Sequence, residues 1–225
     1  MDGVLVDSAE AHYQAWCELG KEVGEPHPRE FFQRTFGMHN REIIPLWLGD
    51  QVPPEEVERL SVLKEALYRK IAARTLEPMD GILDLIDALR EDGFLLGVGT
   101  SGFRENVNLV LKVMGRPECF DAIVTGEDIR EGKPDPEVFL KAIGQLGLGP
   151  QQCAVVEDAP QGVAAALAAG ARAVAVTSTR RAEELKDAHL VVGSLRDLSP
   201  RRLRDVIAGD VTAADSIAGS EYTRA

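Results

Sequence analysis

Carboxylate side chains stand beside apolar stretches in two places in this sequence. Glu157 and Asp158 directly follow the run "CAVV", and Asp2 lies in "MDGVLVDS" at the start of the chain. Adjacent carboxylates, with a further acidic group in another loop, supply the hard oxygen ligands that Mg²⁺ prefers. We therefore expect a magnesium site that includes Asp2, Glu157 and Asp158. The alternative is that Glu157 and Asp158 only provide an acidic N-terminus for the following helix.

Hydroxyl and ammonium groups follow two other apolar stretches. Thr100, Ser101 and Gly102 end the run that begins at Phe94, and Lys133 stands in "GKPDPEVF". Hydroxyls and backbone N–H groups before a helix form an anion site, and a lysine that faces it adds positive charge. With a divalent cation, such groups neutralise a phosphoryl group and align it for in-line transfer. Taken singly, Thr100 and Ser101 could merely end a strand, and Lys133 could be a solvated lysine.

Parallel strands would bring these groups together. Five short apolar runs are typical of strands that are covered on both faces; they are "FLLGVGTS", "FDAIVTGED", "CAVVEDA", "RAVAVTST" and "HLVVGS". Segments with helical periodicity separate them, and "PQGVAAALAAG" has proline near its start and glycine at its end, as helices often do. Alternating strands and helices predict an α/β fold with a doubly wound, Rossmann-like parallel sheet. Ligands of such sheets bind at the carboxyl ends of the strands.

The segment from residue 9 to residue 78 has a different pattern. It contains helical periodicity without a credible strand, and Gly37 separates two of its predicted helices. We therefore predict a helical cap over residues 9–78, inserted into a core of residues 1–8 and 79–208. Residues 209–225 are small, polar and aperiodic, which is typical of a disordered tail.

Composition excludes several classes of function. The chain has 225 residues, 44% of them hydrophobic, and a net charge of −12. This acidity, without a basic cluster, argues against nucleic acid as a partner. The sequence has no apolar run near the ~18 residues of a membrane span and no leader, so we expect neither a membrane anchor nor a signal peptide. Three widely spaced cysteines predict reduced thiols and a cytoplasmic protein.

The polar motifs together resemble those of the haloacid dehalogenase superfamily, and within it the β-phosphoglucomutase-like phosphatases and mutases with a helical cap. The family's first motif reads D-x-D-G-V-x-x-D-[ST], and "MDGVLVDS" matches it from its second position onward. The resemblance implies that Asp2 is the general acid and base, with a backbone carbonyl that binds Mg²⁺. It also implies that Thr100 and Lys133 contact the phosphoryl group and that Glu157 and Asp158 bind the metal.

The resemblance also concerns the residue before Met1. In this family the nucleophile is an aspartate two residues before the acid and base, at the end of a central apolar strand, and that position would lie just upstream of Met1. Without it the family's covalent route through an aspartyl phosphate cannot operate. We expect that the start has been assigned inside the motif, since loss of a central strand would leave backbone groups unpaired at about 1–3 kcal/mol each. A true pseudoenzyme is the alternative.

Residues of the predicted cap are candidates for substrate binding. His12 resembles the family's hinge histidine, although a packed surface histidine is the plain alternative. Lys64 falls where the mutases have a cap lysine. Asn40 occupies the best-aligned position of the mutases' distal phosphate arginine, with Arg41 one residue later. We retain His12, Lys64 and Arg41 as substrate-binding candidates, and the departure at Asn40 puts mutase activity in doubt.

These observations predict a Mg²⁺-dependent phosphohydrolase of small phosphorylated metabolites, with sugar phosphates as the expected class. Ser101 and Gly102 would bind the phosphate beside Thr100 and Lys133. One alternative is a β-phosphoglucomutase-like phosphomutase. The other is a binder of phosphorylated metabolites without catalysis. Ser8 was expected either to cap the following helix or to face the substrate.

Overall fold

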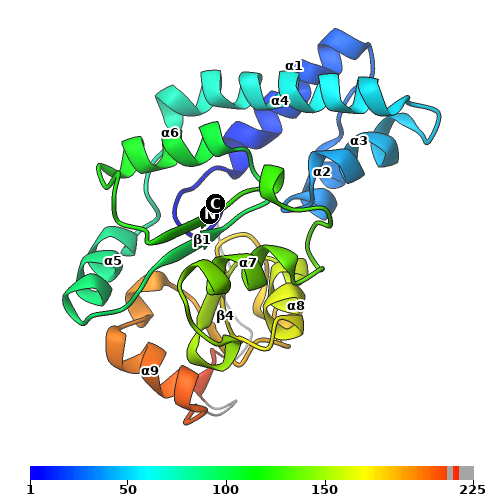
Figure 1. Cartoon of the computed structure of the whole chain (residues 1–225). Helices are drawn as coiled ribbons and strands as arrows, with labels where there is room; N and C mark the ends of the chain where they lie inside the picture. The colour runs from blue at the N-terminus through cyan, green and yellow to red at the C-terminus, as the bar shows by residue number, and fades with distance from the viewer. Residues whose placement is uncertain (212–214, 218–225) are drawn as a thin grey trace.

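The computed structural model describes residues 1–211 and 215–217 of the chain, in which helices and strands alternate after a helical N-terminal segment (Figure 1). The five predicted strands are all present; they are β1 (Gly97–Gly99), β2 (Ala122–Val124), β3 (Ala154–Glu157), β4 (Arg172–Val176) and β5 (Leu190–Val192). The helices are α1 (Ala9–Val23), α2 (Arg29–Thr35), α3 (Asn40–Leu48), α4 (Pro54–Thr75), α5 (Ile82–Glu91), α6 (Arg104–Met114), α7 (Glu137–Gln145), α8 (Pro160–Ala168) and α9 (Pro200–Ala208).

All pairs between these strands are parallel, which confirms the predicted α/β class. The pairing falls into two groups, β1 with β2 and β3 with β4 and β5, where the sequence predicted one sheet. Helices cover the strands because βα units return on the faces of a parallel sheet. α7 packs against β1 and β2, and α8 packs against β3 and β4. The result is a buried core of short, nearly continuous apolar strands, with Val124 and Val174 fully buried.

The two groups of strands are separated by an apolar cavity of about 520 Å³. Gly97–Gly99 of β1 and Ala154–Glu157 of β3 line it, together with apolar side chains of α5 and α7 such as Ile86 and Ile143. Among the described strands, β1 pairs only with β2, and β3 only with β4. One edge of β1 and one edge of β3 therefore border the same cavity. The sheet predicted as continuous is interrupted here, because no described strand pairs with either edge.

The helices α1–α4 form a layer of their own. α4 begins after Pro53 with two glutamates in its first turn, which favour a helix N-terminus. α1 and α3 pack against α4, and α4 also contacts α6 of the other layer (Figure 1). The layer has a separate apolar cluster, whose most buried members include Leu19, Ile44 and Leu60. This separate cluster supports the proposal that the segment from residue 9 to residue 78 is a cap.

The end of the chain follows α9. Of the tail predicted to be disordered, residues 209–211 and 215–217 are described, and residues 212–214 and 218–225 lie outside the described residues. Ser216 Oγ accepts a hydrogen bond from the N–H of Val191, and the N–H of Ile217 donates to the carbonyl of Val191. In the described part of the chain, no helix has the length and apolar character needed to span a membrane.

Candidate active site

A polar cavity of about 70 Å³ lies between the carboxyl ends of β1 and β3 and the helices α1–α4. Residues of the loops after both strands line one side of it, and residues of α1, α3 and α4 line the other. Nine of the ten residues proposed from the sequence line this cavity; they are Asp2, His12, Lys64, Thr100, Ser101, Gly102, Lys133, Glu157 and Asp158. The strands and the helical layer therefore meet at one site.

The acidic pair lies at the end of β3. Glu157 is the last residue of that strand, and it and Asp158 are each 5% exposed. Lys133 forms an ion pair with Glu157, while Asp158 Oδ2 accepts a hydrogen bond from Thr179 Oγ1 at 2.5 Å. Burial and the neighbouring Glu157 raise the pKa of Asp158 to about 6. The N-terminal ammonium and Lys133 act in the opposite direction, but they do not outweigh burial and Glu157.

Two glycines allow these carboxylates to pack closely against the backbone. Gly3 has a φ of +67°, and a Cβ there would lie 2.1 Å from Asp158 Oδ2. A Cβ on Gly162 in α8 would lie 2.1 Å from Glu157 Oε2. A larger residue at either position would displace the carboxylate, so close approach requires both glycines, and the positive φ of Gly3 favours glycine there for a second reason.

The acidic pair fits a Mg²⁺ ion. Its two carboxylates are hard oxygen donors, and the backbone of Asp2 runs directly into Gly3, on which the Asp158 carboxylate packs. Mg²⁺ is held by one or two carboxylates together with waters and substrate phosphates. A cage of three or more His, Cys, Asp or Glu side chains is absent from residues 1–211 and 215–217. Burial and the negative charge of Glu157 together raise the pKa of Asp158, and a divalent cation held by both carboxylates would offset this cost.

The loop after β1 presents hydroxyl and N–H groups to the cavity. Thr100 is buried, and its N–H donates to the carbonyl of Val124 at 3.0 Å. Its Oγ1 accepts from the N–H of Gly102 at 3.1 Å. The buried Ser101 Oγ has no hydrogen-bond partner among the described residues, and α6 begins at Arg104. An unpaired buried hydroxyl close to a helix N-terminus is suited to an anion, because the anion would satisfy it.

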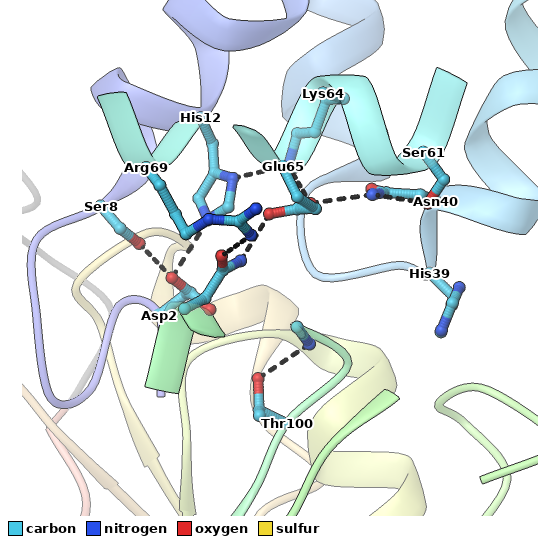
Figure 2. A network of polar contacts seen from close by, with 12 residues as sticks. Asp2, Ser8, His12, His39, Asn40, Ser61, Lys64, Glu65, Arg69 and Thr100 are labelled. Atoms are coloured by element: carbon cyan, nitrogen blue, oxygen red, sulfur yellow. Dashed lines mark hydrogen bonds and ion pairs between the residues drawn. The ribbon is translucent and has the colours of Figure 1, made fainter. Parts of the chain in front are cut away.

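Asp2 is held by two side chains that reach it from the start of α1 (Figure 2). Its Oδ1 accepts from Ser8 Oγ at 2.6 Å and lies 3.1 Å from His12 Nε2. Lys64 Nζ lies 2.8 Å from His12 Nδ1. A charged lysine can only donate, so Nδ1 accepts and Nε2–H donates to Asp2. Burial raises the pKa of Asp2, but the hydrogen bonds from His12 and Ser8 and the nearby N-terminal ammonium outweigh it and bring the pKa below its usual range.

Of the two predictions for Ser8, a helix cap or a residue that faces the substrate, the cap is wrong. Ser8 stands at the N-cap position of α1, yet its side chain makes no capping hydrogen bond. The hydroxyl donates to Asp2 instead. A charged acceptor forms a stronger hydrogen bond than a neutral one does, which explains this preference.

A second lysine–glutamate pair lies on the opposite side of the cavity (Figure 2). Lys64 Nζ is 2.7 Å from Glu65 Oε1, and their side chains are only 3% and 4% exposed. Asn40 Nδ2 donates to Glu65 Oε1 at 2.8 Å, and Asn106 Nδ2 donates to Glu65 Oε2 at 2.5 Å. Arg69 in turn donates to Asn106 Oδ1 at 3.1 Å. Because Asn106 belongs to α6, these hydrogen bonds join α4 to the layer of strands and helices.

Arg41 is the proposed site residue that does not line the cavity. Its side chain is 49% exposed, and its Nε lies 3.8 Å from Glu58 Oε2. Consecutive helical residues point about 100° apart, so the start of α3 can direct only one of Asn40 and Arg41 inward. Asn40 is the one that lines the cavity.

Comparison with known proteins identifies the family to which the chain belongs. The family described as haloacid dehalogenase-like hydrolases matches residues 1–176. The chain is 31% identical over 202 residues to validoxylamine A 7'-phosphate phosphatase from Streptomyces hygroscopicus subsp. limoneus, covering 88% of this chain and 92% of that protein. The chain belongs to the haloacid dehalogenase-like hydrolases.

Two further relatives confirm the resemblance to the β-phosphoglucomutase-like members. The chain is 30% identical over 213 residues to β-phosphoglucomutase from Bacillus subtilis (strain 168), with 91% of this chain and 92% of that protein covered. The crystal structure of β-phosphoglucomutase from Clostridium difficile superposes with a TM-score of 0.83 at 27% identity, covering 92% of this chain and 94% of the other. The α/β fold and its motifs are thus those of this family.

Sequence reasoning missed two polar residues at the site of this haloacid dehalogenase-like hydrolase. Glu65 follows Lys64 in a helix rich in charged residues, where a glutamate is typical of a solvated face. Asn106 lies in α6 with no motif around it, and it is fully buried. Only the packing of α4 on α6 brings Glu65 and Asn106 together. One signal was available: α4 carries Lys64 three residues before Leu67, on the stripe expected to be buried.

Proposed function

We propose that this protein is a Mg²⁺-dependent phosphohydrolase of small phosphorylated metabolites, with sugar phosphates as its substrates. The observation that carries the proposal is the meeting of the acidic pair, Lys133 and the Thr100–Gly102 loop at one cavity. Phosphoryl transfer depends mainly on positioning and charge neutralisation, and these groups supply both. One relative is named as a phosphatase of a 7'-phosphate and another as β-phosphoglucomutase, which supports a phosphorylated carbohydrate as substrate.

In this proposal the metal, the lysine and the loop after β1 all act on the phosphoryl group. Glu157, Asp158 and the backbone carbonyl of Asp2 hold Mg²⁺, which when bound neutralises phosphoryl oxygens. Lys133 supplies a fixed positive charge to the same oxygens. Thr100, Ser101 and the N–H of Gly102 donate hydrogen bonds to the phosphoryl group.

Asp2 is proposed to act as general acid and then as general base. It would give a proton to the leaving oxygen and later accept one from the water that hydrolyses the aspartyl phosphate. The contacts from Ser8 and His12 favour the ionised carboxylate, which suits the second of these tasks. For the first task Asp2 must carry a proton, so we expect its side chain to leave Ser8 and His12 when substrate binds.

The nucleophile is proposed to be an aspartate immediately before Met1, at the end of an apolar strand. The apolar cavity between β1 and β3 supports this proposal, because both bordering strands have edges without a partner among the described strands. A parallel strand there would satisfy backbone groups that otherwise cost about 1–3 kcal/mol each when buried. The intact mass of the protein from its natural source, compared with the 24.4 kDa of this chain, tests the assignment.

The decisive experiment is product analysis with a hexose phosphate. The protein isolated from its natural source, with its length verified and the proposed aspartate present, would be incubated with hexose 1-phosphate or hexose 6-phosphate, a trace of hexose bisphosphate, and either Mg²⁺ or a chelator. We expect inorganic phosphate and free hexose with Mg²⁺ and neither product with chelator. Isomerised hexose phosphate would support a mutase instead. Thermal stabilisation by the hexose phosphate without turnover, in a protein of verified length, would support a binder.

A further inference from the structure

The charge on the cap side of the cavity is compensated within the cap itself. Among the described residues that α1–α4 contribute to the cavity, Lys64 is the only lysine or arginine. Its ammonium lies 2.7 Å from Glu65 Oε1 and 2.8 Å from His12 Nδ1, so two of its three donors are engaged by the protein. A phosphate placed near Lys64 would have to compete with a carboxylate that is already bound.

Glu65 is held in its ionised form. Besides Lys64, its carboxylate accepts hydrogen bonds from Asn40 and Asn106. Burial opposes the charge, but Lys64 and these donors outweigh it and lower the pKa of Glu65 to about 2. Glu65 therefore carries its negative charge at physiological pH.

The remaining surroundings do not offer a second anion site. The other cap residues along the cavity are neutral; they are Trp16, Phe32, Thr35, Phe36, Gly37, Met38, Asn40 and Ile43. Arg41 faces Glu58 outside the cavity. A phosphate dianion loses hydration when it moves next to an apolar wall. Without a free cation nearby to replace that hydration, the transfer costs free energy.

We propose that Glu65 is a specificity-determining residue that restricts the site to phosphate monoesters whose distal part is uncharged. This inference rests on the proposed function and names the substrate class for it. The phosphoryl group occupies the side with Lys133 and the acidic pair, and the neutral, hydroxyl-bearing part of the metabolite faces Asn40, Thr35 and the aromatic side chains. Glu65 acts by cancelling the charge of Lys64 rather than by touching the phosphoryl group.

A purely structural role for Glu65 is the competing explanation, since its bond to Asn106 joins α4 to α6. The two explanations differ in how binding depends on the charge of the ligand. A structural role predicts equal losses for every ligand when Glu65 is changed. Charge cancellation predicts tighter binding of a ligand with two anionic groups and little change for a ligand with one.

The test is calorimetric titration of the protein, in the presence of Mg²⁺, with non-hydrolysable hexose phosphonates. One ligand carries a single phosphonate, and the other carries a phosphonate at each end. We expect the wild-type protein to bind the monophosphonate at least tenfold more tightly. In Glu65→Gln, which keeps the size and the acceptor oxygen, the bisphosphonate affinity should rise about tenfold while the monophosphonate affinity changes by less than threefold.

Further variants separate the outcomes. Glu58→Gln removes the same charge outside the cavity and should leave the ratio of affinities unchanged. Adding Lys64→Met to Glu65→Gln should abolish the gain for the bisphosphonate. The inference fails if wild type binds both ligands equally well, a comparison that needs no variant to fold, or if Glu65→Gln weakens both alike. If wild type binds neither ligand, the proposed function fails and the inference fails with it.

Discussion

Two buried lysine–glutamate pairs face each other across one cavity, and their surroundings give them different capacities. Lys133 and Glu157 lie beside Asp158, whose additional negative charge leaves the core side suited to a divalent cation. Lys64 and Glu65 lie beside neutral donors such as Asn40, so the cap side is balanced without a metal. The contacts of an ion pair, rather than the pair itself, therefore decide whether it can bind a ligand.

The largest expected effect would come from removing the extra carboxylate beside Lys133 and Glu157. This side of the cavity would then resemble the side with Lys64 and Glu65. Asp158→Asn removes the uncompensated charge, so phosphate release should fall by about 10²–10³-fold as several kcal/mol of metal-dependent stabilisation is lost. In wild type, Mg²⁺ at 100 times its Kd should raise the free energy of unfolding by about 2.7 kcal/mol, and in the variant it should not.

The control for this variant is Asp50→Asn, at an exposed position between α3 and α4. It should retain both the turnover and the stabilisation by Mg²⁺, as measured by phosphate release and thermal unfolding. An Asp158→Asn protein that is stabilised by Mg²⁺ as strongly as wild type would remove the distinction between the two sides.

A second effect, on stability rather than on turnover, is expected when the packing of α1–α4 is weakened without touching the charges of this layer. Leu60 is 1% exposed in the apolar cluster of α1–α4, and Leu60→Ala should lower the free energy of unfolding by about 2–5 kcal/mol. Both tryptophans of the chain, Trp16 and Trp47, lie in this cluster or against it, so their fluorescence during urea denaturation reports on the cap. Leu46→Ala, at a position 60% exposed, is the matched control and should change stability by less than about 0.5 kcal/mol.

The smallest expected effect concerns the pH dependence of the cap. Burial, helped by the charge of Lys64, lowers the pKa of His27 to about 4 from 6.5. The unfolded chain therefore binds a proton that the folded cap excludes, so stability falls as the pH drops from about 6.5 toward 4. Between pH 7.5 and pH 5 we expect a loss of about 1–2 kcal/mol in the urea denaturation followed by tryptophan fluorescence.

His27→Phe tests the origin of this dependence. The ring of His27 stacks on Trp16 with centroids 4.9 Å apart, and phenylalanine keeps an aromatic ring there. The variant should lose the larger part of this pH dependence, and the remainder would come from His39, whose pKa is also lowered by burial. An unchanged pH profile would assign the effect to another group and leave His27 as a packing residue only.

Much of the core side could be predicted because its elements are local in sequence. Glu157 and Asp158 directly follow an apolar run, and Thr100–Gly102 end another, so the chain order alone places them at strand ends. All five strands predicted from such runs are present. The division of the strands into two groups could not be predicted, because pairing depends on which strand edges meet in space.

The sequence by itself determined the helices, the strands and the loops that end in functional groups, because hydrophobic period and residue order act over a few neighbouring residues. Tertiary structure decided which charges meet. It directed Asn40 rather than Arg41 into the cavity, and it brought Asn106 of α6 to Glu65 of α4. The free energy of a buried charge depends on its partners in space, and residues 41 positions apart become partners only when the helices pack.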